Sequence, residues 1–179
     1  LQDWAPEIYS MGHRNPQGMA INPVTGEIWT HEHGPQGGDE INIIVPGDNY
    51  GWPEVSYGFE YGTENKVSKY NTLEGFNDPE WVWLPSIAPS GMAFYPSKDM
   101  TGNMFPELNK TLLVGSLKFR RLYVVELNNA GLPKSESVLI DGSIGRVRDV
   151  AVAKDGSILL LNDESSTNNP KGGLYRLSR

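Results

Sequence analysis

The chain contains no cysteine among its 179 residues. Disulfide bonds and thiolate metal sites are therefore excluded, although the absence of cysteine does not fix the cellular compartment. Long apolar runs are also missing. No stretch approaches the roughly 18 apolar residues that suggest a membrane-spanning helix, and the mean hydropathy is −0.43. We therefore expect no membrane span.

Basic residues are fewer than acidic residues. The chain has 15 Lys and Arg against 22 Asp and Glu, which gives a formal net charge of −7. Because nucleic-acid phosphates are bound by basic surfaces, this balance argues against a nucleic-acid partner. The hydrophobic fraction is 38%, with 10% aromatic residues. That composition is too apolar for a disordered chain and suffices for one domain with a core.

The sequence shows little helical periodicity and no leader segment. Its apolar runs are short and mostly alternate with polar residues, as strands do. The 20 glycines and 13 prolines predict many turns. The chain begins at Leu1 without a charged-then-apolar leader, so we expect any signal peptide to have been removed or to lie upstream. We also expect this chain to be a processed or truncated piece.

A strand-turn-strand pattern recurs along the chain. It begins at Gly18, at Gly91 and at Asp149, and each copy ends in a further alternating strand. Three copies of such an all-β unit are typical of β-propeller blades, and a β-sandwich is the alternative. Since propellers usually have about four to eight blades, the sequence predicts part of a larger ring. We expect repeats at 12–55, 86–140 and 141–179, with a loop insertion at 56–80.

Three polar segments could carry chemistry, and the first spans residues 12–18. Its Arg14 offers a planar fork for a carboxylate or a developing oxyanion, and Asn15 beside it offers both a donor and an acceptor. A polar turn with a surface arginine is the plainer interpretation.

The second segment spans residues 31–40 and is rich in glycine. Glycine and proline bend the backbone there, so that successive carbonyls can turn toward one centre, and hard cations such as calcium accept carbonyls together with carboxylates. His31 and His33 share one face of a strand, but a pair of histidines is not by itself a zinc site. A glycine-rich hairpin loop is the alternative.

The third set consists of the cations Lys118, Arg146 and Arg148. The two arginines stand two residues apart, so both can project from the same face of a strand. Three cations from two repeats that converge at a propeller axis would attract a polyanionic small ligand. A solvated strand face is the alternative.

Together these segments resemble the glucose/sorbosone dehydrogenase family, the soluble aldose dehydrogenases that depend on pyrroloquinoline quinone (PQQ). Further matching segments are Asn49–Pro53, Pro85–Gly91, Ser116–Lys118 and Arg146–Val150, and the resemblance extends from about Met11 to the end. It implies the C-terminal half of a six-bladed β-propeller in a periplasmic or secreted protein. It also implies an aldose sugar as substrate, oxidised at its C1 hydroxyl to a lactone with hydride transfer to calcium-bound PQQ.

The resemblance implies a role for each site residue. Arg14 would be catalytic, through a hydrogen bond to the reactive quinone carbonyl. The backbone carbonyls of Gly34 and Pro35 would bind the calcium that holds PQQ, and Glu40 and Tyr50 would belong to a second, structural calcium site. The residues expected to contact the cofactor are Arg14, Asn15, Ser86, Lys118, Arg146 and Arg148.

One element of the family pattern is missing. The family's general base is a histidine in the N-terminal half, and His13, His31 and His33 do not fall at its motif. We therefore expect the isolated chain to be inactive, to pair with the N-terminal half of the propeller, and to associate as a homo-oligomer through open strand edges when alone. A non-catalytic propeller that binds carbohydrate or protein is the main alternative. A lactone-hydrolysing propeller is a third, which the arginine and lysine set argues against.

Overall fold

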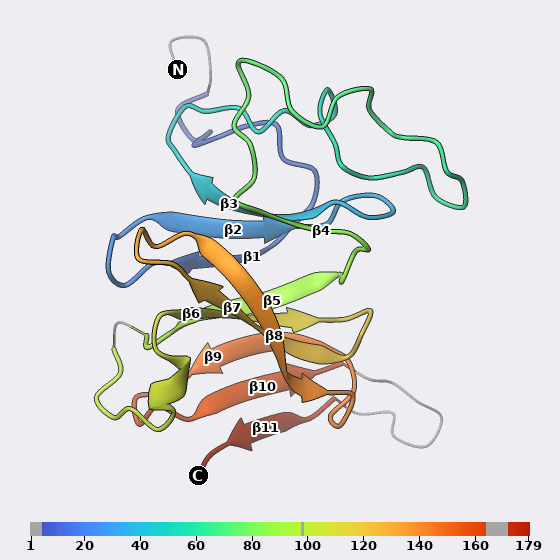
Figure 1. Ribbon diagram of the computed structural model, residues 1–179. Helices are drawn as coiled ribbons and strands as arrows, with labels where there is room; N and C mark the ends of the chain where they lie inside the picture. Colours follow the sequence, from blue (N-terminus) through green and yellow to red (C-terminus); the bar gives the residue numbers. More distant parts are fainter. Residues whose placement is uncertain (1–4, 98, 164–171) are drawn as a thin grey trace.

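The computed structural model describes residues 5–97, 99–163 and 172–179, and these form three antiparallel sheets (Figure 1). The sheets follow one another along the chain, each built from consecutive strands. The all-β class predicted from the sequence is confirmed. Within the described ranges, no helix is long and apolar enough to cross a membrane.

The first sheet carries the longest connection of the chain, between β3 and β4. Its strands lie in the order β1-β2-β3-β4. The segment between β3 and β4 contains the predicted insertion, so the outermost strand of this sheet comes after the insertion. The strands are β1 (Pro16–Ile21), β2 (Ile28–Glu32), β3 (Asp39–Ile44) and β4 (Trp81–Trp83).

The second sheet has the order β5-β6-β7-β8, and in the third sheet β10 lies between β9 and β11. A short 3-10 helix, η1 (Pro106–Leu108), connects β5 to β6. The strands are β5 (Pro89–Tyr95), β6 (Thr111–Ser116), β7 (Arg121–Leu127), β8 (Pro133–Asp141), β9 (Val147–Val152), β10 (Ile158–Asn162) and β11 (Leu174–Leu177).

Local sequence explains the hairpins. Between β1 and β2, the Asn22 carboxamide oxygen accepts the Val24 N–H at 3.0 Å, and the N–H of Gly26 donates to the Asn22 carbonyl at 2.9 Å. Gly26 has φ +78°, a conformation that glycine adopts without strain. The turn sets the register Ile21 to Ile28, and this register buries Trp29 of β2.

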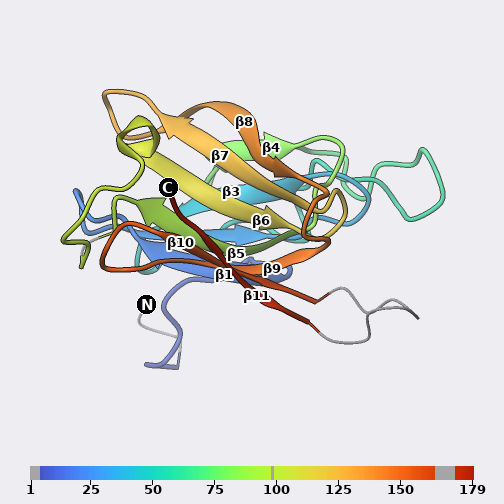
Figure 2. The ribbon, with the colours of Figure 1, turned by 90° about the horizontal axis from the view of Figure 1, so that it is seen from below.

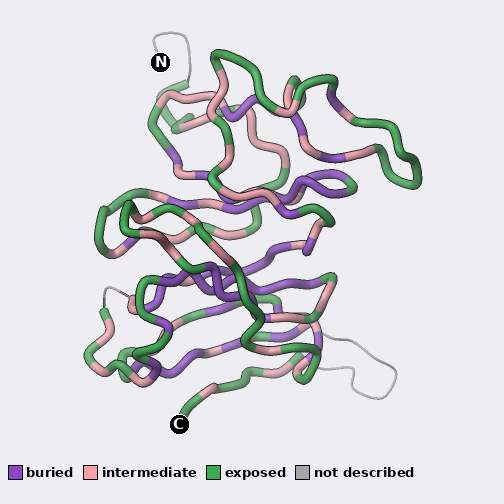
Figure 3. The backbone as a smooth tube through the Cα atoms, viewed as in Figure 1, coloured by how far each residue is buried: buried purple, intermediate pink, exposed green. Residues whose placement is uncertain are grey.

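The apolar core lies between the faces of the sheets. Trp29 and Ile41 of the first sheet pack against Phe94 and Leu112 of the second. The next residue of β6, Leu113, belongs to a separate cluster with residues of the third sheet. Because successive strand residues point to opposite faces, β6 is buried on both sides, as Figure 3 shows for the middle of the molecule. The sheets therefore stack face to face.

The strands β1, β5 and β9 start at the same end of the stack. Figure 2 shows these strands gathered on one side of the molecule, away from β4 and β8. The Ser90 hydroxyl donates to the carbonyl of Val147 at 2.6 Å, and the His33 ring contacts the carbonyl of Pro89 at 2.7 Å. These contacts join the starts of β5 and β9, and join the end of β2 to β5. The loops at this end therefore come from all three sheets.

Candidate functional site

The loops at this shared end hold most of the residues predicted for the site. Arg14 and Asn15 come directly before β1, and the glycine-rich loop 33–38 follows β2. Ser86 comes shortly before β5, and Lys118 lies in the turn from β6 to β7. Arg146 comes directly before β9. The fold thus brings segments far apart in sequence to one end of the molecule.

Arg14 is fixed at both its backbone and its side chain. Its guanidinium Nη1 donates to the carbonyls of His33 and Gly34, each at 2.9 Å, and the group lies over the Trp52 ring at 5.3 Å from the centroid. The backbone N–H groups of Arg14 and Asn15 both donate to one carboxylate oxygen of the buried Glu32. This arginine is therefore a positioned group that fixes the carbonyls of the glycine-rich loop.

Asp39 joins this loop to the segment before β5. It is buried, and its Oδ1 accepts the Gly34 N–H at 3.0 Å and the Ser86 hydroxyl at 2.7 Å. Its Oδ2 accepts the N–H of Ala88 at 2.8 Å. Ala88 has φ +52°, which is uncommon for a residue other than glycine. The carboxylate therefore stabilises an unusual backbone turn beside the site.

A cavity of about 360 Å³ opens between these loops. We name it the cofactor cavity after Ser86 and Lys118, two residues that the sequence predicts to contact a cofactor and that line it. Tyr61 reaches it from the segment between β3 and β4, where the Gln36 side-chain oxygen accepts the N–H of Gly62 at 2.9 Å. Lys118 is exposed and brings a positive charge to its wall. The cavity is lined by His33, Gly34, Pro35, Gln36, Gly37, Asp39, Tyr61, Ser86, Ala88 and Lys118.

The other three predicted cations, Arg14, Arg146 and Arg148, lie at the same end but outside this lining, as does Asn15. Arg146 contacts Asp163 at 3.4 Å from its Nε, and the Arg148 guanidinium hydrogen-bonds the same carboxylate. Both arginines reach one acceptor, although only Arg148 lies in β9 and Arg146 directly precedes it. Asp163 partly neutralises them, and the residues that line the cofactor cavity include neither.

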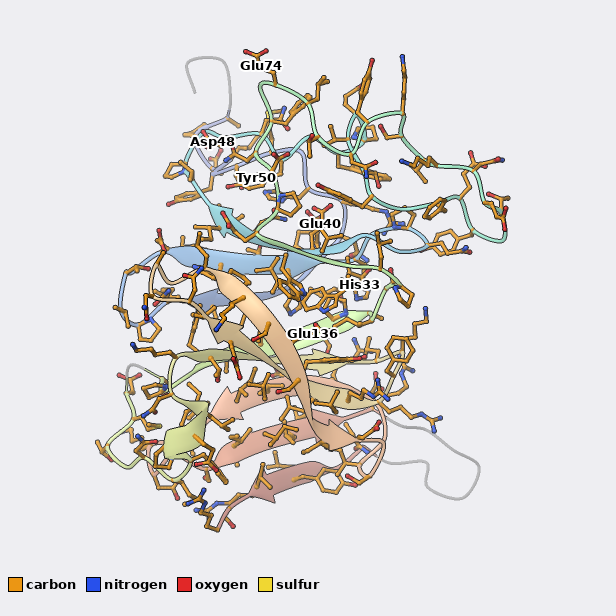
Figure 4. All side chains as sticks on the ribbon, in the orientation of Figure 1. His33, Glu40, Asp48, Tyr50, Glu74 and Glu136 are labelled. Atoms are coloured by element: carbon orange, nitrogen blue, oxygen red, sulfur yellow. The ribbon has the colours of Figure 1, made fainter. Side chains whose placement is uncertain are left out.

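A second, much smaller cavity of about 20 Å³ lies under Arg14. We call it the ion-sized cavity, because that volume suffices for one water or one ion. Glu32, Gly34, Pro35, Glu40 and Tyr50 are among its lining residues. Figure 4 shows Glu40 between β3 and the loop that carries Tyr50.

The ion-sized cavity carries an unusual carboxyl group. Burial, and then the neighbouring carboxylate of Glu32, raise the pKa of Glu40 from 4.5 to about 8. The Tyr50 hydroxyl is already engaged, since it donates to Ile43 and accepts from the N–H of Val45. Tyr50 can therefore offer a cation only its backbone carbonyl. The described residues hold no cluster of three or more His, Asp or Glu side chains suited to a metal, so backbone carbonyls have to complete any cation site.

The histidines occupy separate positions. His31 is fully buried, and burial lowers its pKa from 6.5 to about 4, so the ring is neutral near pH 7. His13 stacks on the Tyr50 ring at 4.6 Å. His33 is held by the Pro89 carbonyl.

Two structural carboxylates were missed by sequence reasoning, Glu32 and Asp39. Both stand in the glycine-rich segment, and each accepts backbone N–H groups of a neighbouring loop. The sequence feature that marks Asp39 is its place directly after two glycines and before an apolar run; its hydrogen-bond partners follow only from the fold. No local signal pairs Glu32 with Arg14, because the partners lie 18 residues apart.

The chain was compared with known proteins. The family model described as "Glucose / Sorbosone dehydrogenase" matches residues 2–176. The chain is 42% identical over 161 residues to aldose sugar dehydrogenase YliI of Escherichia coli strain K12, covering 89% of this chain and 42% of that protein. It is 30% identical over 216 residues to quinoprotein glucose dehydrogenase B of Acinetobacter calcoaceticus, covering 92% and 44%.

Solved structures agree with these matches. A crystal structure of glucose dehydrogenase superposes with a TM-score of 0.85 at 41% identity, over 98% of this chain and 48% of that one. The PQQ-bound aldose sugar dehydrogenase of Streptomyces coelicolor gives 0.71 at 27% identity, over 97% and 48%. The predicted fold class, three blades of a β-propeller, is confirmed. The chain spans less than half the length of these relatives.

Proposed function

Because the chain belongs to the glucose/sorbosone dehydrogenase family, we propose that it forms the cofactor-binding half of a PQQ-dependent aldose dehydrogenase. The proposed reaction oxidises the C1 hydroxyl of an aldose to a lactone, and bound PQQ supplies the acceptor for the C1 hydride. A histidine of the N-terminal half would remove the hydroxyl proton. The observation that carries this proposal is the fixed Arg14 guanidinium on the carbonyls of His33 and Gly34, which also line the cofactor cavity.

The residues present fit a tricarboxylate cofactor. Lys118 brings positive charge to the cofactor cavity, and the Ser86 hydroxyl lies in its wall. Arg146 and Arg148 would supply further charge-assisted contacts by exchanging Asp163 for a ligand carboxylate. Arg14 and Asn15 would face the reactive carbonyl, where a fixed cation stabilises developing negative charge.

Calcium fits the oxygen donors around Arg14. Gly34 and Pro35 line both cavities, and their carbonyls would hold the calcium at PQQ. The buried Glu40 carboxylate and the Tyr50 carbonyl would hold a second, structural calcium. A divalent cation there would offset the unfavourable burial of Glu40 beside Glu32.

Family membership also supports a proposal for the location and the partner of the protein. We propose a periplasmic or secreted location and a functional partner in the N-terminal half of the propeller. Exposed apolar side chains on β1 support this partner, since Met19 is 69% and Ile21 is 62% exposed.

The experiment uses the full-length protein and separates cofactor affinity from turnover. Loss of one charge-assisted contact costs about 1.5–3 kcal/mol, which is roughly 10- to 150-fold in affinity. Lys118→Ala and Arg148→Ala should weaken PQQ binding by that factor without changing sugar dependence at saturating PQQ. Arg14→Ala should instead lower turnover even when PQQ saturates.

The matched control is Lys154→Ala, an exposed lysine in the turn from β9 to β10 at the opposite end of the sheets. It should keep wild-type PQQ affinity and turnover. Wild-type values in all three test variants, Lys118→Ala, Arg148→Ala and Arg14→Ala, would refute the cofactor assignment. A protein that binds PQQ but reduces no dye with any aldose would support the non-catalytic alternative.

A further inference from the structure

A groove separate from the two cavities lies where β4, the outer strand of the first sheet, meets the second sheet. Its volume is about 290 Å³, and we call it the outer groove. Glu136 of β8 stands at this boundary, close to the first sheet (Figure 4). The groove is lined by Trp81, Val82, Trp83, Leu84, Pro85, Ile87, Phe119, Arg121, Tyr123 and Glu136.

The outer groove is separate from the cofactor cavity, although two chain segments are common to their walls. Ser86 and Lys118 line the cofactor cavity. Their chain neighbours Pro85, Ile87 and Phe119 line the outer groove. No residue lines both spaces, so the two lie on opposite sides of these segments and can be tested independently.

The walls of the groove combine aromatic rings with hydrogen-bonding groups. The Trp81 indole N–H is buried and has no hydrogen-bond partner among the described residues, and such an unpaired donor is costly. One Glu136 oxygen accepts the Trp83 N–H at 2.6 Å, and the other oxygen can accept from a ligand. The Tyr123 hydroxyl accepts a long bond of 3.4 Å from Arg121 and can still donate.

The charges at the groove do not favour an ionic ligand. Arg121 is paired with Asp141 at 2.8 Å, so its charge is largely compensated. It also lies over the Phe119 ring at 5.5 Å, and Lys118 lies over the same ring at 5.3 Å. That aromatic face already has cationic partners, which leaves no open cage for a cationic ligand.

We propose that the outer groove binds a neutral pyranose sugar, either free or at the end of an oligosaccharide. The C–H face of a pyranose carries partial positive charge and packs on aromatic rings, whose faces are electron-rich. Trp81, which is partly buried and lines the groove, offers such a ring, whereas the Phe119 face already has its cationic partners. The hydroxyls of the sugar can donate to Glu136 and accept from Tyr123, and they can accept from the buried Trp81 N–H once the indole turns toward the groove. This mixture of aromatic walls with a few polar groups is typical of small-ligand sites. The proposal goes beyond the dehydrogenase function and does not depend on it.

The test measures sugar binding to the chain without PQQ or calcium. D-glucose, D-galactose and maltose are titrated while tryptophan fluorescence and amide NMR shifts are followed. We expect saturable binding in the millimolar range. Glu136→Gln and Trp81→Phe, which keep size and ring respectively, should each weaken it by roughly tenfold. Glu126→Gln on β7, whose carboxylate contacts Ser135 outside the groove lining, should leave it unchanged.

Several results would overturn the assignment. The first is that none of the three sugars binds saturably up to about 100 mM. The second is that wild type and both groove variants bind the sugars with equal affinity. The third is that choline binds saturably and none of the sugars does. Arg148→Ala separates the two hypotheses. Its guanidinium pairs with Asp163 and does not line the outer groove, so the variant should weaken PQQ binding in the full-length protein and leave sugar binding at the groove intact.

Discussion

The buried Glu40 carboxyl makes the stability of the metal-free chain depend on pH. Its pKa is about 8 in the folded chain against 4.5 without burial, so between these values the folded state holds a proton that the unfolded state releases. The stabilisation is complete below pH 4.5 and is lost as pH rises through 8. At 1.36 kcal/mol per pH unit the loss is about 5 kcal/mol, an upper value because water entering the ion-sized cavity would reduce it.

The assay is urea denaturation in EDTA at intervals from pH 5 to pH 9, with wild type and Glu40→Gln in parallel. Glutamine has a similar shape and does not titrate, so the difference between the two curves isolates Glu40. The wild type should lose stability relative to the variant across this window. The control Glu60→Gln, at an exposed loop position, should follow the wild type.

Added calcium should reverse the loss of stability that ionised Glu40 causes. At pH 8–9 a cation beside Glu40 favours the ionised carboxylate, so added calcium should restore wild-type stability and have little effect on Glu40→Gln. Parallel pH curves for wild type and Glu40→Gln would refute the reasoning, as would a relative wild-type stability that rises with pH.

Three further predictions concern burial and association. Burial lowers the pKa of His31 to about 4, so the unfolded chain takes up a proton on His31 before the folded chain does as pH falls below 6.5. The free energy of unfolding should therefore fall by about 3 kcal/mol between pH 6.5 and pH 4. Urea titrations of His31→Gln should show a smaller loss of stability over this range. Asp39→Ala removes the acceptor of three hydrogen bonds and should lower the free energy of unfolding by about 2–4 kcal/mol, whereas unchanged stability would contradict its role as the link between the loops. The purified chain should sediment as a dimer or larger species through its exposed apolar faces and strand edges, and a monomer at high concentration would contradict the open-ring interpretation.

The sequence was most informative where apolar runs stand between turn signals. Alternating or continuous apolar runs located β1, β2, β3, β5, β6, β7, β9, β10 and β11, because strands buried on one or both faces carry apolar residues between glycine, proline and polar turns. They failed for β4, which has three residues, and for β8, whose residues are mostly exposed. These two are the outermost strands of their sheets, where burial imposes no clear pattern. Their position follows from packing against the neighbouring strand.

The site shows a similar division. Residue type and local bends singled out Arg14 and the glycine-rich loop as candidates, and the structure places the two in contact. The role of Asp39 could not be predicted, since its partner Ala88 lies 49 residues away. The placement of Lys118 in the wall of the cofactor cavity likewise depends on how the first two sheets stack.

The pairing of Arg146 and Arg148 with Asp163 bears on how a cofactor would be held. Both arginines are more than 40% exposed at their side chains, and exposed ion pairs contribute only about 0–1 kcal/mol. Asp163, directly after β10, therefore holds the two guanidinium groups together, and a carboxylate ligand that replaces it would lose little. Arg14 differs, because its partners are backbone carbonyls of the loop itself. Under the proposed function, a ligand carboxylate would replace Asp163 at Arg146 and Arg148, whereas Arg14 is already held by the loop, which is the fixed geometry that the proposed role at a reacting carbonyl requires.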